Sequence, residues 1–311
     1  MPSPILTLAQ DGPDAHVWNH VFSKNAEGYW TWSGHMGNLI LSGVILILVG
    51  LYVASKIKTG PAAQGTNRYI TTSKFAHLVE VLCVYLRDEV ARPLLHDRTE
   101  KLMPILWTFF FFILVNNLLG MVPIMDVIHL ANHTWHEEHR TPFGGTATQN
   151  IWVTGALAVL AMIIFNGAAV MRLGIGGYLK HLTADSPWYV WPIIVPIEFA
   201  GQIIIKPAAL AIRLFANMTA GHILLAALFG FAATALTVIK EQTILGAAGI
   251  SLVSVVGAIC ITFLELFVAV LQAFIFMFLI AVFISLMDHH GDHHEHGHEH
   301  EQDHALGHEV A

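Results

Sequence analysis

The stretch ILGAAGISLVSVVGAICITFLELFVAVLQAFIFMFLIAVFISLM, from Ile244 to Met287, decides the class of the fold, because Glu265 is its only charged residue. It is far longer than the roughly 20 apolar residues that cross a hydrocarbon core of about 30 Å as a helix. In lipid the backbone polar groups need partners within the chain, and the stretch is too long for one barrel strand. The sequence therefore predicts a helical membrane protein.

More apolar blocks precede this stretch. They lie at about Met36 to Val53, Leu102 to Met121, Ile151 to Met171 and Trp188 to Ile239. The 311-residue chain is 55% hydrophobic and 12% charged, whereas soluble domains carry roughly a quarter charged residues. The last two blocks exceed one perpendicular crossing, so they tilt strongly or begin with a helix in the membrane plane. We expect an all-α membrane protein with about five transmembrane helices, the last two a long, strongly tilted antiparallel hairpin.

The chain divides by composition into three parts. Residues 1–35 form an N-terminal extramembrane segment, residues 36–287 the membrane domain, and residues 288–311 a tail rich in His and acidic residues, which we expect to be solvated and disordered. Between the first two apolar blocks, hydrophobic residues recur at helical spacing from Phe75 to Val90, which predicts a helix at about 75–95. A helix lying on the membrane surface and a helix packed against a partner subunit explain this pattern equally well.

Charged residues predict the orientation of the chain in the membrane, because cytoplasmic loops are enriched in Lys and Arg. The loop after the first block holds Lys56, Lys58, Arg68, Lys74, Arg87, Arg92, Arg98 and Lys101. The next loop, residues 126–150, is mainly acidic and rich in His. We therefore expect the N-terminus outside and the C-terminus in the cytoplasm. No transit peptide is evident, so a bacterial plasma (inner) membrane is the expected location.

Several classes of site find no support in the sequence. There is no GxxxxGK[ST] motif for nucleotide, no pattern that indicates a cofactor, and a net charge of -7 argues against nucleic acid as a partner. Cys83 and Cys260 lie far apart in apolar surroundings and are interpreted as packing residues rather than a disulfide. The outer loop around residues 129–139 and the tail are rich in His, but neither shows the fixed spacing of a tetrahedral metal site. We expect no metal.

Polar and charged residues inside the last two blocks are the candidate functional site. They are Glu198, Lys206, Arg213, Asn217, His222, Glu265 and Gln272. An Arg at the centre of a membrane helix costs roughly 2.5 to 3.5 kcal/mol on insertion scales, so such residues mark ion or proton paths. Arg213 lies deepest in its apolar run and is the strongest candidate. For Lys206, a side chain that extends to the lipid headgroups is an equally good explanation.

An antiparallel hairpin that turns at residues 240–243 matches these residues in depth. Gln272 is then level with Arg213, and Glu265 with His222, to within two residues or about 3 Å of helix rise. Arg213 and His222 are nine residues apart and point to opposite sides of their helix. A buried neutral imidazole that joins two helices is one interpretation of His222. The acid at the same level favours a proton relay, since His titrates nearest physiological pH.

Three motifs resemble subunit a of F-type ATP synthases. They are KPAALAIRLFANMTAGH (Lys206 to His222), LQAFIF (Leu271 to Phe276) and NNLLGMVP (Asn116 to Pro123). The resemblance covers the chain from about Phe75 to Met287, and the motif around the arginine is highly specific.

The resemblance implies a role for each candidate residue. Arg213 matches the essential arginine that faces the rotating ring of c subunits, with Asn217 and Gln272 as its polar neighbours. His222 and Glu265 match positions lining the periplasmic-side access channel. Glu198 matches the acid near the cytoplasmic exit, although it lies one residue farther from the Lys-Pro pair than is usual.

The implied function is that of a proton-conducting stator subunit. The implied partners are the c-subunit ring, a b-type peripheral stalk, other ATP synthase subunits, the lipid bilayer and protons, and the chain is not an enzyme by itself. Two alternatives remain: a proton- or metal-coupled secondary transporter, suggested by the His-rich loops, and a purely structural stator subunit. The transporter hypothesis is weakened because no internal repeat is visible.

Overall fold

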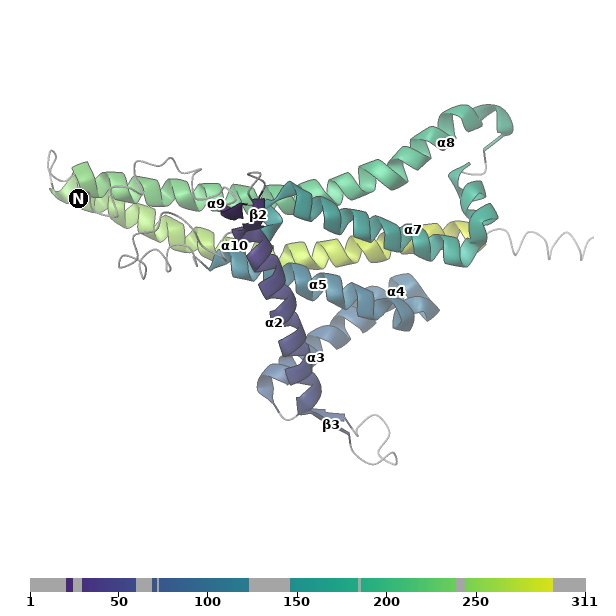
Figure 1. Ribbon diagram of the computed structural model, residues 1–311, viewed down its shortest axis with the longest axis horizontal. Helices are drawn as coiled ribbons and strands as arrows, with labels where there is room; N and C mark the ends of the chain where they lie inside the picture. Colours follow the sequence, from purple (N-terminus) through teal and green to yellow (C-terminus); the bar gives the residue numbers. More distant parts are fainter. Residues whose placement is uncertain are drawn as a thin grey trace, which may run out of the picture. The chain divides into compact units, whose positions relative to one another are not determined.

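The computed structural model describes residues 21–24, 30–59, 69–71, 73–122, 146–183, 186–238 and 244–292. Helices dominate this part of the chain (Figure 1). Within it, five helical stretches are long and apolar enough to cross a membrane: Gly34–Lys56, Lys74–Met121, Ile151–Lys180, Trp188–Leu228 and Ser251–Met287. The predicted all-α membrane fold with five spans is confirmed.

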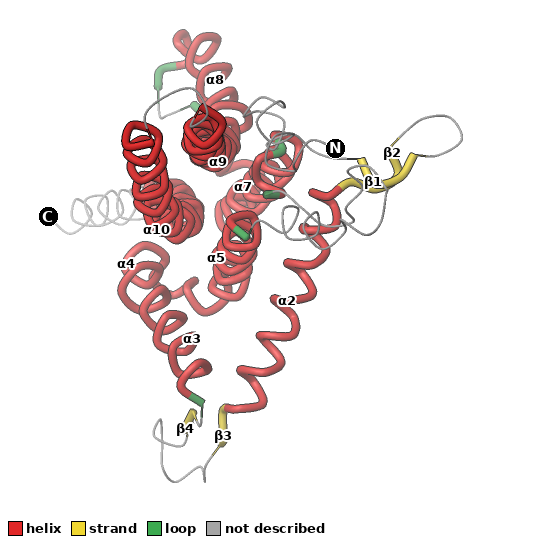
Figure 2. Tube along the Cα trace, turned by 90° about the vertical axis from the view of Figure 1, so that its left-hand side faces the viewer, coloured by secondary structure: helices red, strands yellow, loops and turns green. Residues whose placement is uncertain are grey.

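The remaining elements are short. Two small antiparallel hairpins pair β1 (Val21–Lys24) with β2 (Trp30–Ser33) and β3 (Ile57–Thr59) with β4 (Tyr69–Thr71). They flank α2 (Gly34–Lys56), whose first turn is capped by the Ser33 hydroxyl, which accepts from the backbone N–H of Met36. Figure 2 shows β3 continuing directly from the end of α2. These hairpins give the first crossing a defined start and end.

The chain folds as two compact units, described here one at a time. The first unit contains Met1–His77, Phe109–Thr154 and Ile212–Phe274. It includes the C-terminal part of α5 (Thr99–Met121), a 3₁₀ turn at Ala147–Gln149, and most of α9 (Lys206–Val238) with the first half of α10 (Ile244–Asp292). In this unit α9 and α10 run antiparallel and side by side (Figure 1). Its interior includes Phe110, Ile113, Leu214 and Met218.

The second unit contains Leu78–Thr108, Gly155–Ala211 and Ile275–Ala311. Its described elements are most of α3 (Lys74–Tyr85), α4 (Arg92–Leu95), a 3₁₀ turn at His96–Arg98, the start of α5, most of α7 (Ile151–Leu182), a 3₁₀ turn at Trp188–Val190, α8 (Trp191–Ala200) and the ends of α9 and α10. Its interior is made by Leu86, Met103, Leu106, Phe165, Leu210, Phe276 and Met277.

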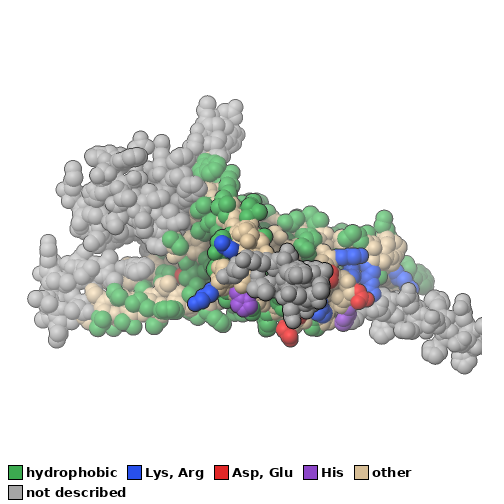
Figure 3. Space-filling view, turned by 90° about the horizontal axis from the view of Figure 1, so that it is seen from below, with side chains coloured by type: hydrophobic (Ala, Val, Ile, Leu, Met, Phe, Trp, Pro, Cys, Tyr) green, Lys and Arg blue, Asp and Glu red, His purple; other side chains and the backbone are tan. Residues whose placement is uncertain are grey.

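Hydrophobic side chains also lie on the outside, as expected of surfaces that face lipid. Ile47, Leu51, Phe263 and Phe267 are each more than 60% exposed. In the face shown in Figure 3, hydrophobic side chains cover much of the described surface and charged ones gather in a few places. An exposed apolar surface of this extent is unfavourable in water and marks a membrane or protein contact.

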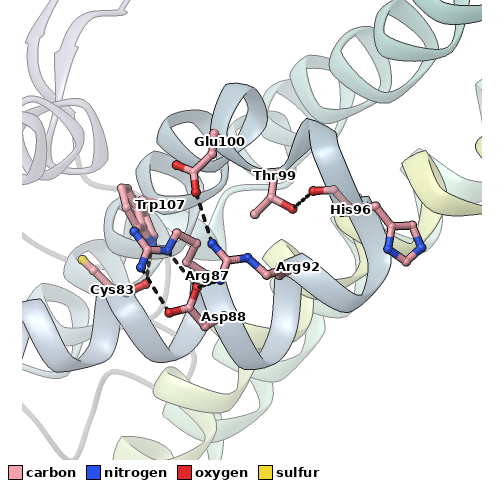
Figure 4. A network of polar contacts seen from close by, with 8 residues as sticks. All are labelled: Cys83, Arg87, Asp88, Arg92, His96, Thr99, Glu100 and Trp107. Atoms are coloured by element: carbon pink, nitrogen blue, oxygen red, sulfur yellow. Dashed lines mark hydrogen bonds and ion pairs between the residues drawn. The ribbon is translucent and has the colours of Figure 1, made fainter. Parts of the chain in front are cut away.

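An ion-pair network closes the turn from α3 to α5 in the second unit (Figure 4). Asp88 accepts from Arg87 at 3.0 Å and pairs with Arg92 at 2.9 Å, and Arg92 reaches Glu100 at 3.3 Å. The Trp107 indole donates to the Cys83 carbonyl at 3.2 Å, which ties α5 back to α3. The predicted helix at about 75–95 is thus present as a helical segment with a packed inner face, and whether it lies on a membrane surface stays a prediction.

Some element bounds differ from the predicted ones. The third crossing was predicted to end at Met171, but α7 continues to Leu182 through a kink at Gly174, whose φ of 68° suits glycine. The last helix passes Met287 and ends at Asp292, so the first residues of the predicted tail are helical. The outer loop at 129–139, the hairpin turn at 240–243 and the tail after residue 292 lie outside the described residues.

Two π turns interrupt the helices, and each comes directly before a basic residue followed by proline. Leu86–Ala91 precedes Arg92-Pro93, and Gly201–Ile205 precedes Lys206-Pro207. The backbone N–H of Lys206 bonds to the Gly201 carbonyl, five residues back. Proline lacks an N–H and its ring crowds the carbonyl four residues earlier, so a wider turn relieves the conflict. The second π turn lies among the candidate site residues.

Candidate functional site

His222 on α9 is the centre of a polar cluster in the first unit. Its Nδ1 lies 3.5 Å from the Glu265 Oε1 atom on α10 and 3.0 Å from the Met218 carbonyl of its own helix. Its Nε2 lies 3.1 Å from the Gly120 carbonyl at the end of α5 and 3.1 Å from the Thr146 hydroxyl. We call His222, Glu265, Gly120 and Thr146 the His222 cluster. The predicted pairing of His222 with Glu265 at one level is confirmed.

Both ring nitrogens of His222 have hydrogen-bond partners. A neutral imidazole has one N–H and donates to only one of the two carbonyls, whereas the imidazolium donates to both. When Nε2 is unprotonated, the Thr146 hydroxyl is placed to donate to it instead. The Glu265 Oε1 atom is buried without a hydrogen bond from the described residues, so a charged His222 also supplies its counter-ion. The cluster therefore has hydrogen-bond partners for either protonation state of the ring.

Two glycines create the space for this cluster. A Cβ at Gly120 would overlap the Thr146 side chain, and a Cβ at Gly221 would overlap the Glu265 carboxylate. Thr146 is fully buried and Glu265 is 9% exposed. Small residues allow close approach of helices in membranes, and here they bring three separate chain segments onto one imidazole.

Further buried polar residues extend from the His222 cluster. The Thr148 hydroxyl donates to Asn117 at 2.9 Å, and the Asn117 amide donates to the Ala269 carbonyl at 3.4 Å. Gln149 donates to the Met218 carbonyl, which is also a partner of His222. The 3₁₀ turn at Ala147–Gln149 contacts α2, where His35, Asn38 and Ser42 are buried polar residues. The sequence prediction missed this group, although the pair Asn116-Asn117 inside an apolar run was a signal for it.

Arg213 lies elsewhere on α9, on an exposed face with Ala216, Asn217 and Ala220. It makes no hydrogen bond or ion pair with any residue that the structure describes. An arginine in an apolar helix requires a counter-charge or water. Since the neighbours on its face are small, another helix can approach the guanidinium closely.

Gln272 bonds to Asn217 rather than to Arg213. Its Oε1 accepts from the Asn217 amide at 2.8 Å, and Asn217 lies one turn beyond Arg213. Packing sets the register of the two helices, and the equal depth of Gln272 and Arg213 stays a prediction. Asn217–Gln272 and His222–Glu265 are mutually consistent in this register. Arg213 is therefore left without a polar partner on α10.

Glu198, Gln202 and Lys206 form a row in the second unit, which we call the Glu198 row. The Gln202 amide donates to Glu198 Oε1 at 3.0 Å and accepts from Lys206 Nζ at 2.7 Å. The Lys206 ammonium lies 5.1 Å from the centre of the Phe283 ring, within reach of a cation–π interaction. Lys206 is thus held by contacts within this unit, and whether it also lies near the lipid headgroups stays a prediction. The π turn takes up one more residue than an α turn, which accounts for the extra residue between Glu198 and the Lys-Pro pair.

The sequence of this chain is similar to those of known proteins. A sequence model of the ATP synthase A chain family matches residues 37–285. The chain belongs to the ATP synthase A chain family. ATP synthase subunit a 2 of Chlorobaculum tepidum is 39% identical over 256 residues, covering 82% of this chain and 63% of that protein. ATP synthase subunit a of Myxococcus xanthus is 41% identical over 254 residues, covering 79% and 70%. The match spans about two thirds of these relatives.

The family match includes every candidate residue, from Glu198 to Gln272, together with the His222 cluster. The N-terminal hairpin and the end of the tail lie outside it. With its five apolar helices, this member of the ATP synthase A chain family is a multi-pass membrane protein. Whether the His-rich segments bind metal stays a prediction, because they lie outside the described residues.

Proposed function

We propose that this chain is the proton-conducting stator subunit of a rotary F-type ATP synthase, with Arg213 as the barrier between two half-channels. The observation that carries the proposal is the separation of two polar centres on α9. Arg213 is exposed on a face of small residues and has no polar partner among the described residues. His222 is turned into a cluster that contains Glu265. Family membership supports the same function.

Arg213 faces the carboxyls of a rotating c-subunit ring. A ring carboxyl gives up its proton beside Arg213, because a nearby cation stabilises the carboxylate. The guanidinium keeps its charge at any accessible pH, so it relays no proton itself and repels cations that would leak along the helix. Asn217 and Gln272, bonded to each other, hold the polar edge of this face.

The outer half-channel runs through His222 and Glu265, and the inner half-channel leads through Glu198. A ring carboxyl that has passed Arg213 takes a new proton from the His222 cluster, whose ring has partners for both protonation states. Each proton that crosses 100 mV supplies about 2.3 kcal/mol. The ring transmits the torque to separate catalytic subunits, so this chain binds no nucleotide and catalyses no reaction by itself.

The proposed setting is the plasma membrane of a bacterium, with the N-terminus outside and the C-terminus in the cytoplasm. Basic residues between α2 and α5 support this orientation, including Lys56, Lys74 and Arg87. A b-type peripheral stalk and the remaining synthase subunits are the other proposed partners.

Substitution of Arg213 tests the proposal. In membrane vesicles that carry the whole complex, Arg213→Ala should assemble normally and lose ATP-driven proton pumping and proton-driven ATP synthesis, each by more than about 100-fold. Arg92→Ala is a matched control, since this arginine is exposed and belongs to the ion-pair network of Figure 4. Coupled pumping at the wild-type rate in Arg213→Ala would contradict the proposal.

The two competing functions predict different results. A purely structural stator subunit predicts poor assembly and intact proton flux in whatever complex remains. A proton- or metal-coupled transporter predicts transport by the purified chain in vesicles without a c ring. Proton transport by the chain alone would favour the transporter.

A further inference from the structure

The Glu198 row joins an acid to a base through one amide. Gln202 is 2% exposed. Its amide nitrogen donates to Glu198, and its amide oxygen accepts from Lys206. If the amide flipped, its NH₂ would face the ammonium and its oxygen would face the carboxylate, and both contacts would be repulsive. The two charges therefore fix the orientation of Gln202, and Gln202 in turn fixes the position of the Glu198 carboxylate.

The π turn makes the row straight. In an α-helix, residues four apart drift around the axis by about 40°, so three residues spaced by four spread over about 80°. A π turn rotates less per residue because its hydrogen bonds close five residues back. The step from Glu198 to Gln202 is mainly α-helical, and the step from Gln202 to Lys206 lies mainly in the π turn. Four residues turn through more than one full rotation in the first step and through less than one in the second, so the two angular offsets have opposite signs. The three side chains can then touch in sequence.

Other residues of the second unit interact with the two ends of the row. Lys206 packs over Phe283 of α10, and Phe283 packs edge-on against Phe165 of α7 with ring centres 5.5 Å apart. At the other end, Tyr178 of α7 interacts electrostatically with Glu198, and its hydroxyl donates to Asn166 at 2.8 Å. The titratable groups that interact with Glu198 thus include Lys206, which also reaches it through Gln202, and Tyr178.

We infer that Gln202 is a positioning residue of the inner half-channel. It holds the Glu198 side chain in one position in the proton path, by donating a hydrogen bond that Lys206 fixes from the other side. The inference rests on the proposed function, since it assigns Glu198 to the proton path. Gln202 itself carries no proton and acts through Glu198.

Two isosteric substitutions separate its two hydrogen bonds. Gln202→Met keeps the volume and loses both bonds. Gln202→Glu still accepts from Lys206 but no longer donates to Glu198, and it adds a second negative charge beside Glu198. Ile204→Met is the matched control, because Ile204 lies in the same π turn and is 61% exposed.

The measurement is ATP-driven proton pumping in inverted vesicles with the whole complex, as a function of the pH of the outer buffer, which bathes the cytoplasmic face. Gln202→Met should pump about tenfold more slowly, the size expected for one hydrogen bond to a charged group. A hydrogen bond donated to a carboxylate stabilises the ionised form only, so its loss should move the alkaline limb of the pumping profile to higher pH. It should move farther in Gln202→Glu, and Ile204→Met should match the wild type.

Three results would overturn the inference: wild-type rate and profile in Gln202→Met, an equal loss at every pH without a shift, or wild-type behaviour of Gln202→Glu. The last two would leave Gln202 with a structural role only. If Gln202→Met assembles poorly, the pH profile of pumping by Gln202→Glu tests the inference on its own. Failure here is distinct from failure of the proposed function, because Arg213→Ala abolishes coupling under the proposed function whatever the outcome at Gln202.

Discussion

The His222 cluster and the Glu198 row are both acid-base groups in apolar helices, but they are built in opposite ways. The His222 cluster takes one residue each from α5, the segment before the 3₁₀ turn at Ala147–Gln149, α9 and α10. The Glu198 row takes all its members from one helical stretch, each four residues from the next. One site depends on how segments pack, and the other on how one helix winds.

This difference decides what each site tolerates. The His222 cluster exists because Gly120 and Gly221 leave room for Thr146 and Glu265, so added volume should break it. The Glu198 row has no such requirement, since its members are neighbours along the helix and need only the register that the π turn supplies. The His222 cluster should therefore be sensitive to changes in packing, and the Glu198 row to changes in helical register.

Among the variants that test this contrast, the largest effect is expected at Gly120. In Gly120→Ala the new Cβ overlaps the Cβ, Oγ1 and Cγ2 atoms of Thr146. Rotation of the Thr146 side chain moves Oγ1 and Cγ2 but not the Cβ, so the backbone must move. Overpacking of this kind costs about 1 to 3 kcal/mol. We expect a lower thermal midpoint of the purified complex and more than about tenfold less pumping per membrane. Gly43→Ala in α2 is the control, because a Cβ there meets no atom within 4 Å. Unchanged stability of Gly120→Ala would show that Thr146 is free to move.

A smaller and purely functional effect is expected at Gly221. In Gly221→Ala the Cβ meets the Glu265 carboxylate, which is the end of a flexible side chain and can turn aside at little cost in stability. Assembly should stay normal and pumping should fall about three- to tenfold, since the displaced acid leaves His222. Gly230→Ala on the same helix α9 meets no atom within 4 Å and gains the same helix propensity. Equal pumping rates of the two variants would argue against a role for the Glu265 position.

The sequence predicted the fold well where the physical rule is local. Long apolar runs require helices in lipid, so the five crossings followed from composition alone. The kink at Gly174 and the π turns before Pro93 and Pro207 were not predicted, because glycine and proline permit several backbone responses and packing selects one.

The site was predicted in part for the same reason. Equal depth in a hairpin placed Glu265 beside His222, but depth alone did not show that Gln272 bonds to Asn217 rather than to Arg213. Thr146 and Gly120 escaped prediction because their link to His222 joins positions 76 and 102 residues apart, and no periodicity encodes such a contact. Glu198 and Lys206 were named from the sequence, whereas Gln202 needed the observed bonds.

The smallest effect is the difference in coupling energy between a hydrogen bond that joins two helices and one within a single helix. In double-mutant cycles with alanine, Asn217 and Gln272 should couple by about 0.6 to 1 kcal/mol, because their hydrogen bond joins two helices and is lost when they separate. Glu198 and Gln202 should couple by at most about 0.2 to 0.5 kcal/mol, because a bond within one helix persists in the bilayer after the helices part. The measurement is thermal unfolding of the purified complex for each single and double variant. Similar coupling energies for the two pairs would mean that the Glu198 row depends on tertiary packing as much as the Asn217–Gln272 bond does, and the contrast between packing and winding would then fail.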